Sequence, residues 1–436
     1  MDRIFSNRWA NPAAVLVIAV SVLIAYSNSF HAAFQFDDLP NIANNVHIHS
    51  IDNFWSILKS NRGVTYITFA LNYAVGGPDV FGFHIVNTVI HIINSALVYF
   101  LLLSTLGLMG FATARARFIA VFAALLFALH PVQTQSVTYI VQRMESLSAT
   151  FFILALMLFV RGAGSPGPAR RWAYYGLTGA CYVLSFYSKE TAITLPAVVL
   201  LFDFCFVSKG SPRGLLKKRW PFYGLLAALL GVFIVATIMP MGGFSDLSEE
   251  SAAPERVVQA PSVGTTGMAR LKASEVTALS AGFSMKGISP KEYLFTEFNV
   301  MAYYFALVLV PVNQNLDYDF PVSKSLFEAP EVKPGTALTI PLPPPVVSLV
   351  FLLFIAGIGV WFMAATQNSP GAARRLVAFF IFWYFIILSP TSSVVPIADV
   401  IYEHRLYLPS LALFTVFAVC VEACASRLFN GRHGAA

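Results

Sequence analysis

Long apolar runs recur along the whole chain, and they leave little choice of fold class. A helix needs about 20 apolar residues to cross the hydrocarbon core of a bilayer. The sequence holds several runs of that length, from 12–30 near its start to 411–425 near its end. Only 11% of its 436 residues are charged, whereas a soluble domain has about a quarter. The sequence therefore predicts an all-α polytopic membrane protein, a single domain over residues 1–436, with about 10 to 11 transmembrane helices.

The charged residues indicate how the chain lies in the membrane. Lys and Arg gather in short loops between apolar runs, most densely in 209–219, and this bias is typical of cytoplasmic loops. The net charge of +6 therefore marks an inner face and does not predict a nucleic-acid partner. By the same rule, segment 293–311 begins and ends on the outer side of the membrane, so we expect that it does not cross the bilayer. We expect a bacterial inner-membrane protein whose active site faces the periplasm, an organelle lumen being the alternative.

This orientation places three long loops on the outer side, at 31–80, 240–292 and 312–345. Two half-apolar stretches of the first loop suit helices that lie on the membrane surface. The polar residues expected on this side are Asp37, Asp38, His130, Arg143, Glu145, Lys189, Glu190, Asp317, Asp319, Glu403, His404 and Arg405. Charged groups at that depth are costly unless they are solvated, paired or in use, so their gathering on one face predicts a single polar site.

The predicted site has the residue types that transfer from a phosphate donor requires. Asp37 is the first candidate for a general base acting on an acceptor hydroxyl, and Asp38 for positioning the acceptor or a metal. The candidates for holding the donor phosphate are Arg143, Lys189, Arg405 and His404, because cations stabilise such a group. The candidate pocket residues are His130, Glu145, Glu190, Asp317 and Glu403. Metal dependence stays open, with Mg²⁺ or Mn²⁺ as the candidate ions.

Plainer readings of the same residues stay open. The acidic pair also suits a helix cap or a hydrated turn, and the neighbouring Arg143 and Glu145 suit an ion pair in an interfacial loop. No GxxxxGK[ST] or Rossmann glycine pattern indicates a soluble nucleotide, so the donor would be lipid-linked and reach the site from the bilayer.

A polar stripe inside one predicted span favours a different class of function. His84, Asn87, His91 and Asn94 recur at helical spacing within 81–106, and so share one face. Hydrogen bonding between helices explains this stripe, and ligand or metal binding is the alternative. A transporter or flippase for lipid-linked glycans needs polar groups near the midplane; an assembly partner without catalysis is the third class.

The motifs that carry these residues resemble those of one known family. Phe36-Asp37-Asp38 is similar to its first outer loop, and 130–137 with 143–145 to its HPVHTEAV…GRAE stretch. Residues 188–194 resemble KExGIT, 316–318 LxxDY, 390–393 PxSN, and 403–409 ERxLYLPS. The family is the transmembrane O-mannosyltransferases with tetratricopeptide repeats (TMTC), which are GT-C glycosyltransferases.

This resemblance implies an inverting, GT-C-type transfer of a sugar from a polyprenyl-phosphate donor to a protein hydroxyl at the outer face, or to a glycan. By this resemblance the acidic pair Asp37-Asp38 has the base role. The residues that match the later motifs would shape the pocket for donor and acceptor. Three features depart from the family. The sequence shows no 34-residue repeats, so we expect it to lack the repeat domain; Gln135 stands where a carboxylate is expected; and His404 separates Glu403 from Arg405.

Overall fold

Helices form the framework of the computed structural model, which describes residues 9–238, 287–336, 338–365 and 371–430. Most of the predicted outer loop 240–292 falls outside these residues. The long helices are α2 (Ala10–Tyr26), α5 (Val80–Leu108), α6 (Thr113–Leu129), α8 (Arg143–Ala163), α9 (Pro168–Phe186), α11 (Pro212–Ile238), α13 (Pro290–Leu309), α14 (Pro345–Ala365), α15 (Ala372–Leu388) and α16 (Ser410–Asn430). Shorter helical elements are η2 (Leu39–Ala43), α3 (Phe54–Leu58), α4 (Gly63–Gly76), η5 (Pro131–Gln133), α7 (Thr134–Thr138), η7 (Glu190–Thr194), α10 (Leu195–Phe202), η8 (Asp203–Val207) and η11 (Glu403–Leu406). No β-strand occurs in the described ranges, which confirms the predicted all-α class.

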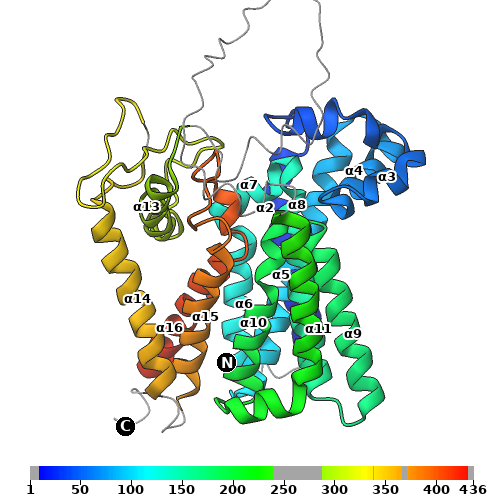
Figure 1. Ribbon diagram of the computed structural model, residues 1–436. Helices are drawn as coiled ribbons and strands as arrows, with labels where there is room; N and C mark the ends of the chain where they lie inside the picture. The colour runs from blue at the N-terminus through cyan, green and yellow to red at the C-terminus, as the bar shows by residue number, and fades with distance from the viewer. Residues whose placement is uncertain (1–8, 239–286, 337, 366–370, 431–436) are drawn as a thin grey trace, which may run out of the picture.

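Six helical segments are long and apolar enough to cross a membrane. They are Ala10–Ser29, Val80–Leu108, Ile140–Ala163, Glu190–Val207, Pro345–Ala365 and Ser410–Leu428. A seventh forms if Thr113–Leu129 and Pro131–Thr138, which are bent by 56° at Pro131, are taken as one span. The helices α9, α11 and α15 run beside these segments (Figure 1). They do not combine the length and the mean hydropathy that the six segments have. The protein is polytopic, and a total of ten to eleven crossings stays a prediction.

Segments that carry candidate site residues gather at one end of the bundle, which we call the loop end. Figure 1 shows α3, α4, α7 and α13 there, with α13 above α14. The interfacial helices predicted for the first outer loop are α3 and α4, and they extend sideways from the bundle (Figure 1). At the opposite end Arg115 of α6 and Glu422 of α16 form a bidentate ion pair at 2.6 Å, among the basic loops that the sequence assigns to the cytoplasm.

Small residues allow the helices to pack closely. Ala116, Ala120 and Ala123 of α6 are fully or almost fully buried, and such residues let helix backbones approach each other in a membrane. Gly162 of α8 is required by its neighbour, because a Cβ atom there would lie 2.7 Å from the ring of Tyr175 in α9.

The polar stripe of α5 holds helices together. His91 contacts the Tyr407 hydroxyl at 2.8 Å and the Ala128 carbonyl at 3.0 Å, while Asn94 donates to the Ser146 carbonyl at 2.7 Å. These bonds join α5 to α6, to α8 and to the link between η11 and α16 that holds Tyr407. They match the interhelical reading of the stripe, in which buried polar groups find partners inside the protein.

Candidate active site

The two adjacent aspartates of the first outer loop have different environments. Asp38 is buried, with 1% of its surface exposed, whereas Asp37 stays accessible to solvent. The turn begins at Phe36, whose φ of +38° lies in the left-handed region that non-glycine residues rarely adopt. After this turn the first carboxylate, Asp37, lies at the surface and the next one, Asp38, points inward.

Asp38 ties the loop to the short turn that precedes α8. Its Oδ1 accepts a hydrogen bond from the Val141 backbone N–H at 2.7 Å, and its Oδ2 accepts one from Gln35 N–H at 3.0 Å. Burial raises the pKa of Asp38 to about 6, although the backbone hydrogen bonds act in the opposite direction. Hydrogen bonds from backbone amides to a buried carboxylate fix its position, so Asp38 holds the loop that carries Asp37.

Asp37 faces groups of both signs. Its backbone N–H donates to the Tyr139 hydroxyl at 2.8 Å. Partial burial and the charge of Asp399 raise the pKa of the Asp37 carboxyl, while Tyr139, Arg62 and Lys189 lower it. Carboxylates whose pKa is raised by burial and by a like charge are frequent among catalytic bases.

The two cations whose charges lower the pKa of Asp37 belong to buried or half-buried ion pairs. Lys189, which precedes η7, is 8% exposed and its Nζ lies 2.7 Å from Glu145 Oε2 and 3.2 Å from Gln142 Oε1. Arg62, which precedes α4, donates from Nε to both carboxylate oxygens of Glu190 at 3.0 Å. About a third of each side chain of that second pair is exposed, so a ligand can reach it. Arg62 was not predicted as a site residue.

Asp399 and Tyr402 bring the last outer segment to the first. Burial and the charges of Asp399, Asp37 and Asp317 raise the pKa of the Tyr402 phenol, so carboxylates from three separate segments act on one phenol. Arg405 fixes the segment from behind, since its two terminal nitrogens donate to the carbonyls of Asp399 at 2.6 Å and Val400 at 2.9 Å.

Glu403 holds the segment that carries Asp317. Its carboxylate accepts hydrogen bonds from Gln314 Nε2 at 2.8 Å and from Asn315 N–H at 3.0 Å, and it also bonds the Tyr318 hydroxyl. Burial raises the pKa of Glu403 to about 7. Asp317 itself is exposed, and Asp319 forms an exposed ion pair with Lys333 at 2.9 Å.

Arg143 and His130 have other partners. Arg143 is fully buried; it donates to Asn87 Oδ1 at 2.6 Å, to the Thr68 carbonyl at 3.2 Å and to the Phe83 carbonyl at 3.0 Å. It thus joins α4, α5 and α8. His130 contacts the carbonyl of Val308 in α13 at 2.9 Å. A role of either residue at a donor phosphate or in the pocket stays a prediction.

The structure thus assembles one mixed-charge site from segments far apart in the sequence. Electrostatic interactions and two hydrogen bonds link the predicted residues Asp37, Lys189, His404 and Arg405 with Arg62, Tyr139, Asp399 and Tyr402, which sequence reasoning missed. One sequence feature could have identified Arg62 as a site residue, namely its place in the loop that carries the acidic pair. No sequence feature marks Asp399, because it stands in an ordinary polar link. Within the described residues no group of three or more His, Cys, Asp or Glu side chains is placed to hold a metal ion.

Comparison with known proteins bears on the part of the chain that holds Arg143, Glu145 and Lys189. Residues 64–238 match the family described as dolichyl-phosphate-mannose-protein mannosyltransferase. The chain is 30% identical over 227 residues to the protein O-mannosyl-transferase Tmtc3 of Drosophila melanogaster, an alignment that covers 45% of this chain and 24% of the relative. The resemblance to the TMTC proteins is confirmed.

Other TMTC relatives give the same result. The chain is 33% identical over 211 residues to mouse TMTC3, covering 45% of this chain and 22% of the relative. With human TMTC4 it shares 28% identity over 229 residues, which cover 47% of this chain and 31% of that protein. The alignments thus span between a fifth and a third of these TMTC proteins. No solved structure matches the chain.

Asp37, Asp399 and η11 lie outside residues 64–238. Their part in the site therefore rests on geometry and on the motifs quoted above.

Proposed function

We propose that this TMTC-like chain is a membrane glycosyltransferase that moves a sugar from a polyprenyl-phosphate donor to a hydroxyl group at the loop end. One observation carries the proposal: a solvent-accessible carboxylate, Asp37, lies close enough to Lys189 and Arg62 for their charges to lower its pKa, at one end of a membrane-embedded bundle. A base next to fixed cations suits a reaction in which a hydroxyl attacks and a phosphate leaves.

Asp37 is the proposed general base. Its carboxylate takes the proton of the acceptor hydroxyl while the hydroxyl oxygen forms a bond to the anomeric carbon of the sugar. The bond from that carbon to the phosphate oxygen breaks, and its electron pair leaves with the polyprenyl phosphate. A single displacement of this kind inverts the anomeric centre. Asp38 serves this step by holding the loop.

Lys189 and Arg62 are the proposed contacts of the leaving phosphate. Each already neutralises one carboxylate, Glu145 and Glu190 respectively, so their charges are held in place before the donor arrives. Fixed charges need little reorganisation as negative charge develops, which is the source of their catalytic value. Arg405 and His404 border the proposed phosphate contacts. The positive charge of Arg405, which is bonded to the carbonyl of Asp399, adds to the charge of Lys189 and Arg62.

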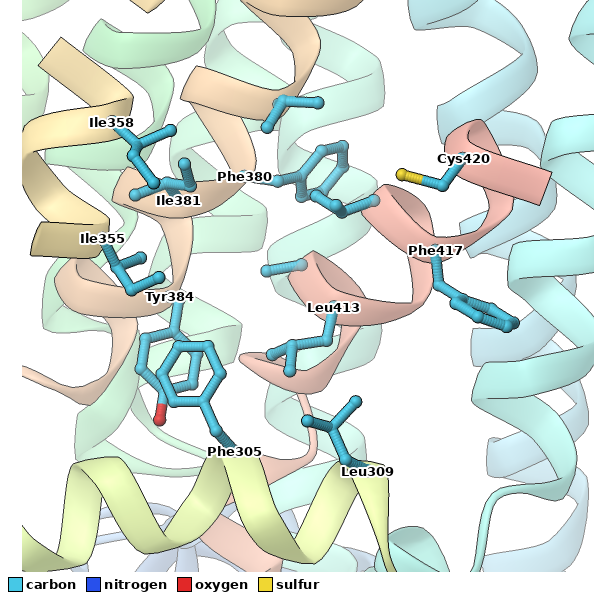
Figure 2. Close-up of a pocket in the computed structure, with 13 residues that line it drawn as sticks. Phe305, Leu309, Ile355, Ile358, Phe380, Ile381, Tyr384, Leu413, Phe417 and Cys420 are labelled. Carbon is cyan, nitrogen blue, oxygen red and sulfur yellow. The ribbon is translucent and has the colours of Figure 1, made fainter. Parts of the chain in front are cut away.

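An apolar groove offers the donor lipid a route to the site (Figure 2). It encloses about 390 Å³ between α13, α14, α15 and α16, and its lining is almost entirely apolar. Phe305 and Leu309 of α13 mark one end, and Cys420 of α16 the other (Figure 2). Next to Phe305, the Tyr304 hydroxyl donates to the Tyr402 carbonyl at 2.9 Å. A polyprenyl chain in the groove would thus place its phosphate near η11.

The acceptor that we propose is a Ser or Thr hydroxyl of a protein, because the similar TMTC proteins are protein O-mannosyl-transferases. The donor sugar by the same reasoning is mannose. The membrane is proposed to be a bacterial inner membrane with the loop end in the periplasm. A transporter is less well supported, because the stripe residues His91 and Asn94 bind neighbouring helices.

Transfer and transport are distinguished in proteoliposomes that contain the protein, labelled polyprenyl-phosphate mannose and a mixture of Ser/Thr peptides. We expect label to move from the lipid to the peptide fraction. Movement of intact labelled lipid between leaflets, without cleavage of the sugar–phosphate bond, would contradict the enzyme and support the carrier.

The groove has a matched pair of variants on α14. Ile358→Trp narrows the groove, whereas Leu353, 61% exposed, faces away from it and Leu353→Trp is the control. Because the Trp ring would fill space that the lipid chain is proposed to occupy, Ile358→Trp should raise the KM of a long-chain donor. The KM of a donor with only two isoprene units should not change. An equal effect of both variants would refute the groove as the binding site of the lipid chain.

A further inference from the structure

Two charged residues of the TMTC-like motifs are replaced by neutral ones in this chain. The HPVHTEAV motif has Glu at the position of Gln135, and alignment of LYLPS with 406–410 puts the Arg of ERxLYLPS at His404. The charged letters that correspond to Arg143, Glu145 and Glu403 are kept. Where the quoted motifs have a Glu and an Arg, this chain thus has two neutral side chains, Gln135 and His404.

The two replaced residues touch each other. Gln135 Oε1 accepts hydrogen bonds from the backbone N–H of His404 at 2.7 Å and from its Nδ1 at 2.9 Å. Both residues are at most 5% exposed. The double contact sets the tautomer of the imidazole, since Nδ1 must carry the proton, and burial with the charges of Lys189, Arg405 and Arg62 keeps the pKa of His404 well below its usual range.

The energetics of buried charges explain why two such changes would occur as a pair. A buried ion pair can be replaced by neutral side chains at little cost, whereas removing one partner leaves an uncompensated charge. Gln135 and His404 keep the contact without either charge.

This contact also connects the segments that form the site. Gln135 belongs to α7, and its Nε2 donates to the Leu316 carbonyl at 3.0 Å, beside the exposed Asp317. His404 belongs to η11, whose Glu403 binds the same segment through Asn315. The contact therefore locks α7, η11 and residues 314–318 in one arrangement.

We propose that Gln135 and His404 act as one coupled positioning unit, a neutral replacement for an ion pair, which holds η11 and residues 314–318 in place for donor binding. The functional part of this inference rests on the proposed glycosyltransferase activity. The coupling between the two side chains does not.

A double-mutant cycle tests the unit with Gln135→Glu, His404→Arg and both together. Each single change buries a charge against a neutral partner, so we expect each to raise the KM for the donor at least about tenfold and to lower the melting temperature. The double variant restores the charge pair and should return to within about threefold of wild type, because contacting residues couple. Gln133→Glu with His404→Arg is the matched control. Gln133 is buried in the adjacent η5 but binds Ser410, so this control should not be rescued.

If the effects of the two single changes on KM and on melting temperature simply add in the double variant, the coupling is overturned. Single variants that melt early but keep the wild-type KM would overturn the positioning role, leaving a purely structural contact. If wild type transfers no sugar, the proposed function falls, and the melting temperatures of the four proteins still decide the coupling.

Discussion

Asp38 gives a prediction in which charge and hydrogen bonding act in opposite directions. Replacing Asp38 by Asn keeps the shape of the side chain and removes its charge. Because the carboxyl is buried, its pKa of about 6 lies above the ordinary value of 3.8, and a unit of pKa corresponds to about 1.4 kcal/mol. The ionised form therefore destabilises the fold by about 3 kcal/mol at neutral pH.

The sign of the pH dependence follows from the raised pKa. The contribution of Asp38 to stability is fully present below pH 3.8 and is lost as the pH rises through about 6. Asp38→Asn should abolish this part of the pH dependence. The amide oxygen can still accept from Val141 N–H, but its NH₂ group then meets Gln35 N–H, which costs about 1 kcal/mol. At pH 7 the variant should be as stable as wild type or more so.

Thermal unfolding in detergent between pH 4 and pH 8 measures this prediction, with Asp38→Ala as the control. Alanine leaves the buried Val141 N–H without an acceptor, a loss of about 1–3 kcal/mol, and should lower the melting temperature at neutral pH. In the transfer assay Asp38→Asn should retain most of the activity. A stable Asp38→Asn protein without activity would refute the reasoning, because Asp38 would then take part in the chemistry itself.

Two further predictions follow from the charges around Asp37. Lys189→Met should destabilise the protein by about 3–5 kcal/mol because Glu145 is left buried without its partner, and adding Glu145→Gln should recover much of the melting temperature; a lone Lys189→Met variant as stable as wild type would contradict this. Asp399→Asn removes a negative charge that raises the pKa of Asp37. The acidic limb of the pH–rate profile should therefore shift to lower pH, and an unchanged profile would show that Asp399 does not act on the base.

The fold class could be predicted from the sequence because apolar run length and charge bias act locally. The stripe of α5 was interpreted correctly for a similar reason, since helical spacing alone puts its residues on one face. Only part of the candidate site could be predicted from the sequence. Adjacent carboxylates look alike in sequence, and a backbone turn at Phe36, together with the N–H of Val141 about 100 positions away, decides which is buried.

Long-range packing accounts for what the sequence did not reveal. Asp399 acquires a role only when the last outer segment folds over the first, and no local pattern announces that contact. Arg143 shows the reverse case, since its charge and position suggested phosphate binding while its buried guanidinium binds Asn87 and backbone carbonyls. Glu190 pairs with Arg62 and not with the adjacent Lys189, because neighbours in a short helical turn point in different directions.

The most direct test of the central claim is the rate of sugar transfer by Asp37→Asn relative to wild type, in proteoliposomes with labelled polyprenyl-phosphate mannose. The Asp37 side chain is accessible to solvent, so the variant should melt close to the wild-type temperature. Loss of a general base lowers the rate by about 10²–10⁴-fold. A folded Asp37→Asn protein that transfers sugar at the wild-type rate would contradict the account.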